Sequence, residues 1–135
     1  MKEKRPNRTL GPVHDDFWAY CNKGELRLQR CNHCRHVSWP PVQACESCGG
    51  SGLTWELLSG RGKVISWCTF EHRYYEEIPI PWEAILVELE EGALFVSNPR
   101  EFTWQDITPN MPVKLAFIDC EDLAGAFRLP VFEKA

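Results

Sequence analysis

Four cysteines in the first third of the chain constrain its fold more than any other feature. They are Cys31, Cys34, Cys45 and Cys48, spaced Cys-x2-Cys-x10-Cys-x2-Cys. Each two-residue gap lets a tight turn bring two sulfurs to one metal ion, and the longer loop folds back to supply the other pair. Four thiolates fill a tetrahedral coordination sphere and leave no position for a reactive water. The spacing therefore predicts a zinc ion that stabilises the fold and does no chemistry.

Two disulfides or an iron-sulfur cluster are the other uses of four such cysteines, and a single iron ion can be bound as in rubredoxin. Disulfides need an oxidising compartment. Residues 1–10 are charged and polar, without the apolar core of a signal peptide, and the cysteine count of seven is odd. Reduced thiols and a cytoplasmic location are therefore expected. Iron in place of zinc stays open, and metal analysis decides it.

The residues after each cysteine pair differ between the two predicted metal-binding turns. Gly49 and Gly50 follow Cys48, and a left-handed residue at this place lets backbone N–H groups point at sulfur. Cys34 is followed by Arg35 instead. The first turn is therefore less typical than the second.

The remaining sequence predicts one modest core beside the metal-binding ribbon. A chain of 135 residues with 44% apolar content can bury one compact unit but not two large domains. No run approaches the roughly 18 apolar residues of a membrane span, so we expect a soluble protein. We divide the chain into an N-terminal arm and helix (1–25), a zinc ribbon (26–60) and a barrel (61–135), with the boundary at Gly60-Arg61-Gly62.

A short helix is expected before the ribbon. Asp15 or Asp16 can cap its start and Gly24 can end it. Its large aromatic residues cannot all share one helical face. Either the helix is buried on more than one side, or part of it meets a partner. The candidates for that partner contact are Phe17, Trp18 and Tyr20.

Five apolar extended runs after Gly62 predict the strands of a small β-barrel. They span residues 63–71, 84–90, 93–97, 113–119 and 125–133. Glu90-Glu91-Gly92 is a hairpin signal, and a longer connection at 98–111 precedes the fourth strand. This order is typical of an OB-fold. The predicted fold class is mainly β: a short N-terminal helical segment, a rubredoxin-like zinc ribbon and a five-stranded OB barrel.

The loop between the first two barrel strands is rich in aromatic residues and proline. Aromatic side chains on a restrained backbone suit a contact surface, although such a loop can equally cover one end of the barrel. The candidate interface residues here are Tyr74, Tyr75 and Trp82.

No catalytic residues are predicted. Cys68 and His72 are a thiol and a base, but four residues along a strand span roughly 13 Å, so they do not form a dyad. Cys68 falls in an alternating set with Val64, Ser66 and Phe70 and is expected to be a small core residue, as are Cys21 and Cys120. His33 and His36 flank a site that four cysteines already satisfy, so we expect them to be solvated.

Charge weighs against nucleic acid as a partner. Residues 1–60 contain eight Lys/Arg and six Asp/Glu, whereas residues 61–135 contain seven and thirteen. Nucleic-acid binding draws most of its affinity from Lys/Arg that neutralise phosphates, and the barrel half carries −6. A single-stranded nucleic-acid binder stays the alternative function, with Trp67, Phe70 and Trp104 as stacking candidates.

The order of motifs resembles a known family over nearly the whole chain from about residue 16. The motifs are Phe17-Trp18, Gly24-Glu25-Leu26, the ribbon with Pro40-Pro41, Gly62 to Ser66, Ile80-Pro81, Val87 to Gly92 and Asn110 to Val113. In this order the chain is similar to the acyl-CoA-associated OB-fold family, once a domain of unknown function, with an N-terminal rubredoxin-like zinc ribbon. Asn110 stands where the family usually has Gly, and Asn also tolerates positive φ.

The resemblance implies an accessory subunit of a heteromeric complex. Its members bind thiolase-fold enzymes, which are thiolases, acyltransferases resembling hydroxymethylglutaryl-CoA synthase, or aldolases that cleave steroid side-chain CoA thioesters. It also implies a contribution to acyl-CoA binding, in which basic side chains would contact the CoA phosphates. The alternative is that these basic side chains are ordinary scattered surface charges. An independent acyl-CoA enzyme is a third hypothesis, which would need thioester turnover by the isolated chain. The candidates for contact with CoA phosphates are Arg61, Lys63 and Arg73.

Overall fold

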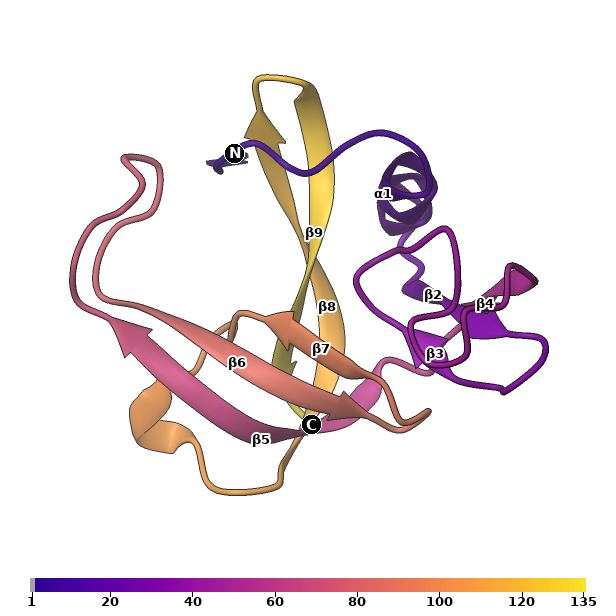
Figure 1. Ribbon diagram of the computed structural model, residues 1–135. Coiled ribbons are helices and arrows are strands. Elements are labelled where there is room, and N and C mark those ends of the chain that lie inside the picture. Colours follow the sequence, from indigo (N-terminus) through magenta and orange to yellow (C-terminus); the bar gives the residue numbers. More distant parts are fainter. Residues whose placement is uncertain (1) are drawn as a thin grey trace.

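The computed structural model describes residues 2–135 and combines one helix, a small ribbon and a curled sheet (Figure 1). The elements are, in order, β1 Glu3–Lys4, α1 His14–Asn22, β2 Arg27–Cys31, β3 Val37–Ser38, β4 Leu53–Leu57, β5 Arg61–Phe70, β6 Trp82–Leu89, β7 Leu94–Ser97, the 3₁₀ turn η1 Trp104–Asp106, β8 Met111–Asp122 and β9 Gly125–Lys134. The predicted mainly β fold with a short N-terminal helix is confirmed. Among the described residues, no helix has the length and apolar character needed to cross a membrane.

The curled sheet contains all five predicted barrel strands. Its order is β1-β8-β5-β6-β7, and β9 pairs with β8 in a long hairpin. Beyond the end of β7 the chain turns back to β9, where the Phe132 N–H donates to the Asn98 carbonyl at 3.1 Å. The Ser97 hydroxyl donates to the Pro130 carbonyl at 2.9 Å. These bonds link the last strand to the β8–β9 hairpin and draw the sheet toward a barrel.

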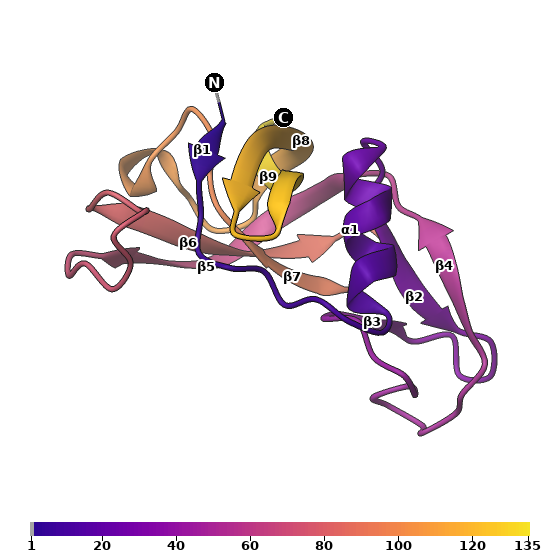
Figure 2. The same cartoon turned by 90° about the horizontal axis from the view of Figure 1, so that it is seen from above.

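The ribbon is a separate antiparallel sheet in the order β3-β2-β4. Gln29 on β2 is buried, and its side-chain amide bonds the Val42 carbonyl and N–H at 2.9 and 2.8 Å. This clamp holds the loop between the cysteine pairs. Figure 2 shows α1 lying between the ribbon strands and the β8–β9 hairpin.

The helix is buried on more than one side by its own chain. Phe17 lies in the core, Trp18 packs edge-on against Phe127 of β9 at 5.3 Å, and Tyr20 contacts Trp55 of the ribbon at 5.5 Å. This is the first of the two alternatives that the sequence left open. The three aromatic side chains thereby join the barrel to the ribbon.

The start of the helix differs from the sequence prediction. Its cap position is Val13, with φ 63° and no side-chain cap. The Asp15 carboxylate instead accepts a hydrogen bond from the Gly11 N–H at 3.0 Å, one turn earlier. Asp15 and Asp16 lie in the first turn, where a negative charge interacts favourably with the helix dipole and stabilises the helix. The prediction that one of them caps the helix is wrong.

A β-bulge in β5 also overturns one sequence prediction. The pairing of β5 with β6 shifts register between Val64 and Ser66, and a shift of one residue moves the following side chains to the other face. Val64 is fully buried, and beyond the bulge Trp67 packs on the core while Ser66 and Cys68 are exposed. Cys68 is therefore not a core residue. The prediction that Cys21 and Cys120 are buried is confirmed.

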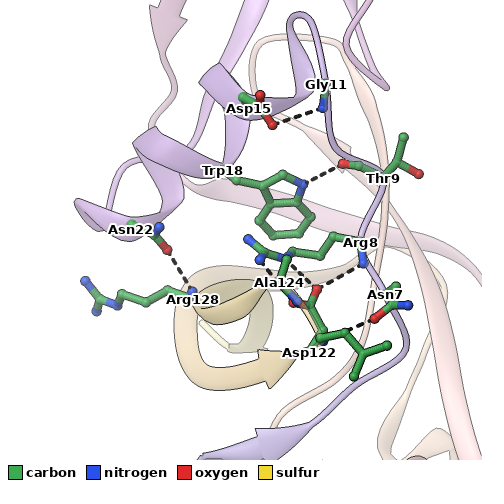
Figure 3. Close-up of polar contacts among 11 residues, drawn as sticks. Asn7, Arg8, Thr9, Gly11, Asp15, Trp18, Asn22, Asp122, Ala124 and Arg128 are labelled. Atoms are coloured by element: carbon green, nitrogen blue, oxygen red, sulfur yellow. Dashed lines mark hydrogen bonds and ion pairs between the residues drawn. The ribbon is translucent and has the colours of Figure 1, made fainter.

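An ion pair fastens the N-terminal arm to the tip of the β8–β9 hairpin (Figure 3). The Arg8 Nε donates to Asp122 Oδ2 at 2.7 Å, and its backbone N–H donates to the same oxygen at 3.1 Å. The guanidinium lies over the Phe127 ring at 4.1 Å. The Trp18 indole donates to the Thr9 carbonyl at 3.2 Å. Both charged side chains are buried, so this contact is screened less than a surface pair.

We expect Asp122→Asn to lower the free energy of unfolding in a pH-dependent way. The Arg8 side chain holds the pKa of Asp122 at about 2, below its ordinary value of 3.8. A depressed carboxyl pKa stabilises the folded state above pH 4, and this contribution is lost as pH falls toward 2. Allowing for solvent screening, the loss at pH 7 is about 1 to 2 kcal/mol.

Urea unfolding of the wild type and the variant at pH 7, 4 and 2.5 measures this difference. The gap between the two proteins should close toward pH 2.5. Asp119→Asn on the same strand is the matched control, because this exposed carboxylate has no ion-pair partner among the described residues. An equal loss in both variants contradicts a role for the ion pair.

Candidate metal centre and partner surfaces

The structure brings the four predicted cysteines together at one end of the ribbon. Their Sγ atoms all lie within 4.8 Å of one another. The Cys31–Cys48 and Cys34–Cys45 sulfurs are each 3.6 Å apart. Sulfurs at the corners of a tetrahedron around a metal ion, with bonds of about 2.3 Å, are about 3.8 Å apart. The four thiols therefore fit one tetrahedral metal ion, and all of them are free.

Both metal-binding turns carry a left-handed residue. Arg35 has φ 69° and Gly49 has φ 78°. Arg35 adopts this conformation without being glycine, and its carbonyl accepts a hydrogen bond from the Arg30 guanidinium at 2.8 Å. The two turns are thus alike in backbone shape although their sequences differ. Four N–H groups point at sulfur at 3.4 Å: His33 and Cys34 at Cys31, Ser47 at Cys45, and Gly50 at Cys48.

These backbone N–H groups stabilise negative charge on the sulfurs to which they donate. The N–H groups of Cys34 and His33 lower the pKa of Cys31 to about 6. The Gly50 N–H lowers the pKa of Cys48, but the hydrogen bonds that the Cys48 thiol donates to the sulfurs of Cys31 and Cys34 outweigh it and raise that pKa to about 11. Without a metal ion, four thiols this close together therefore do not all lose their protons. A divalent cation compensates their charge and lets all four ionise.

The histidines near the cysteines do not complete the ligand set. His33 and His36 are both exposed, as predicted. The His36 Nε2 lies 2.8 Å from the Glu46 carboxylate, which connects the two metal-binding loops. Sequence reasoning missed this contact, because nothing local marks two residues ten positions apart as neighbours. Four sulfurs and no open ligand position make this a structural site.

The six predicted interface residues fall into two groups. Phe17, Trp18 and Tyr20 pack within the chain, as described above. In the loop between β5 and β6, Trp82 stacks on Phe70 at 4.1 Å, whereas Tyr74 and Tyr75 are 72% and 48% exposed. Of the six residues, only Tyr74 and Tyr75 are therefore exposed. Their contact with a partner stays a prediction.

The three candidate residues for CoA phosphates do not form one cluster. Arg61 pairs with Glu90 at 3.1 Å and Lys63 pairs with Glu88 at 3.4 Å, both near the start of β5. Arg73 lies beyond the other end of β5, in an exposed loop. The positive charge of the first two is already balanced by carboxylates. Contact of these residues with CoA also stays a prediction.

Comparison with protein families identifies the ribbon. Residues 18–54 match the family model described as "ChsH2, rubredoxin-like zinc ribbon domain". This range contains all four cysteines, and together with their geometry it makes zinc the structural cofactor of the site.

The whole chain is similar to a solved structure titled "Ltp2-ChsH2(DUF35) aldolase". The TM-score is 0.82 at 26% sequence identity, and the match covers 95% of this chain and 98% of the other. The likeness therefore covers nearly the whole arrangement of elements in Figure 1.

Two curated relatives match this chain. The first is a much longer protein, and the second matches over only part of each sequence. A protein of Thermomonospora curvata named "Probable enoyl-CoA hydratase alpha subunit" is 28% identical over 99% of this chain and 41% of its own length. A "DUF35 domain-containing scaffold protein" of Pyrococcus furiosus is 28% identical over 59% of this chain and 60% of its own length. This chain thus spans about two fifths to three fifths of these relatives. With its zinc ribbon and OB barrel, the chain is similar to proteins described as DUF35 proteins.

Proposed function

We propose that this chain is a non-catalytic, zinc-binding accessory subunit that binds and supports a thiolase-like acyl-CoA enzyme. One observation carries the proposal. Over 95% of its length the chain is similar to a chain in the structure titled "Ltp2-ChsH2(DUF35) aldolase", and this title names two components. The partner would be a thiolase, an acyltransferase or a steroid side-chain aldolase. A cytoplasmic location is part of the proposal, because it keeps the cysteines reduced.

The chemistry of the described residues supports a non-catalytic role. The metal site has four sulfur ligands and no place for a substrate or water. Cys68 is an exposed thiol, but the residue paired with it on β6 is Ala84, and its neighbours on the same face of β5 are Ser66 and Phe70. A nucleophilic thiol needs an adjacent base or a lowered pKa. Among the described residues, the position paired with Cys68 across β5 and β6 thus carries no ionisable side chain.

The nucleic-acid alternative loses two of its three stacking candidates, and only Trp104 of the three is exposed. Trp67 packs against the core and is only partly exposed. Phe70 is already stacked on Trp82. Bases need free aromatic faces and Lys/Arg for phosphates, and the barrel half carries −6. We therefore retain the accessory-subunit function alone.

Affinity purification of the tagged chain from its native host tests the proposal. Mass spectrometry of the co-purifying proteins should identify a thiolase-fold enzyme in stoichiometric amount. Metal analysis of the same sample should find about one zinc per chain. Recovery of nucleic acid alone, or of the chain with no thiolase-fold enzyme, contradicts the proposed function.

A further inference from the structure

The outward face of the β5–β6–β7 sheet is apolar although no part of the described chain covers it. In Figure 1 these three strands lie side by side, with the β8–β9 hairpin standing across them. Val96 and Leu94 of β7 are 50% and 47% exposed, and Cys68 is also exposed. The register places the outward side chains in rows across the strands: Lys63, Glu88 and Leu94; Ser66, Leu86 and Val96; Cys68 and Ala84; Phe70 and Trp82.

The sequence of β6 and β7 is that of strands covered on both faces. On β6 the buried positions Ile85, Val87 and Leu89 alternate with Ala84 and Leu86, which point outward. An antiparallel sheet with one face in water normally alternates apolar with polar residues, whereas a near-continuous apolar run is typical of a strand buried on both faces. The outward face therefore has the composition of an interface.

This face has a shallow hollow at its centre. A cavity of about 470 Å³ lies elsewhere, beside the arm, but the hollow on this face measures about 210 Å³ and is lined by β5, β6 and β7. Its lining residues are Ser66, Trp67, Cys68, Ala84, Ile85, Leu86 and Val96. Small side chains between larger ones leave room for an apolar side chain of another protein, as in interface cores.

The charges around the face indicate which kind of partner covers it. At one end, Lys63 pairs with Glu88, so that end is neutral. At the other end the β5–β6 loop carries exposed carboxylates that have no ion-pair partner among the described residues, next to the exposed tyrosines. These carboxylates are Glu71, Glu76 and Glu77, and with the exposed Arg73 in the same loop they give it a net charge of −2. An apolar centre with an acidic rim complements a surface whose apolar centre is bordered by Lys or Arg.

We infer that this outward face, together with the β5–β6 loop, is the docking surface for the thiolase-like partner enzyme. The inference rests on the proposed function and adds the surface and its charge. A second copy of this chain fits less well, because two chains of net charge −4 repel each other. The partner instead supplies Lys or Arg opposite Glu76 and Glu77, with apolar side chains opposite Leu86 and Val96.

Val96→Lys tests the surface with Leu57→Lys as its matched control. Both are exposed apolar strand residues, at 50% and 54%, and Leu57 lies on the ribbon strand β4 instead. The partner recovered with the tagged wild type is separated and rebound to each immobilised chain. We expect Val96→Lys to weaken binding at least about a hundredfold, because it buries an unpaired charge, and Leu57→Lys to bind like the wild type. Circular dichroism and zinc content should match in all three proteins.

A charge variant tests the rim separately. Glu76→Gln combined with Glu77→Gln should slow association and reduce its dependence on salt. Equal partner binding by the wild type and Val96→Lys overturns the inference and leaves the proposed function intact. Failure of the wild type to recover a thiolase-fold enzyme overturns both. Dimerisation of the isolated wild type that Val96→Lys abolishes assigns the face to a second copy and also overturns the inference.

Discussion

Removal of zinc from the four-cysteine site will unfold the ribbon, abolish partner binding and leave the barrel partly folded. The ribbon has one strand of two residues and two of five, which is too little to bury a core of its own. Structural zinc sites of this kind contribute binding free energies of about 10 to 16 kcal/mol to folding. The barrel keeps its own hydrogen-bonded strands and hairpin, so it should retain β-structure.

Chelator titration followed by far-UV circular dichroism and tryptophan fluorescence measures this loss. Trp55 lies on a ribbon strand and reports its unfolding. Cys45→Ser should behave like the metal-free protein, whereas Cys68→Ser should keep zinc and the fold because Cys68 is not near the site. Full partner binding by zinc-free Cys45→Ser would refute the role of the metal.

Phe95→Ala should cause the largest loss of stability among single core substitutions, about 3 to 5 kcal/mol. Phe95 is 2% exposed and meets three separate parts of the chain. Its ring lies 6.5 Å from Phe17 of the helix, 4.7 Å from Trp39 of the ribbon and 6.2 Å from Phe132 of β9. Truncation leaves a cavity where helix, ribbon and barrel join, so it removes the packing that couples them.

Urea unfolding of the zinc-bound proteins measures this effect. The wild type should unfold in one transition, and Phe95→Ala should show a lower midpoint and separate transitions for ribbon and barrel. Val96→Ala, the exposed neighbour on the same strand, is the control and should change stability by about 0.5 kcal/mol or less. A single unshifted transition in Phe95→Ala would show that the three parts are not coupled through this residue.

The features that the sequence predicts well are encoded by neighbouring residues. The cysteine pairs are close in sequence, so their spacing alone places four sulfurs around one point. The five barrel strands follow from local apolar runs and turn residues. Asn110 before β8 has φ 63°, the left-handed conformation expected where the family usually has Gly.

The features that the sequence does not reveal depend on distant contacts or on one extra residue. Arg8 and Asp122 are 114 positions apart, and no local pattern pairs them. The bulge after Val64 reverses the alternation of β5, so Cys68 points outward although the simple period of two predicts the opposite. Val13 stands at the cap position of the helix although its side chain makes no capping hydrogen bond. Tertiary contacts decide each of these cases.

Reconstitution of thioester turnover tests the central claim most directly. The purified chain, the co-purified thiolase-fold enzyme and their mixture are compared for turnover of acyl-CoA substrates, with zinc-free Cys45→Ser as the control chain. We expect no turnover by the chain alone, weak turnover by the enzyme alone and full turnover only by the mixture that contains the zinc-bound chain. Turnover by the isolated chain, or full activity of the enzyme without it, would contradict an accessory role.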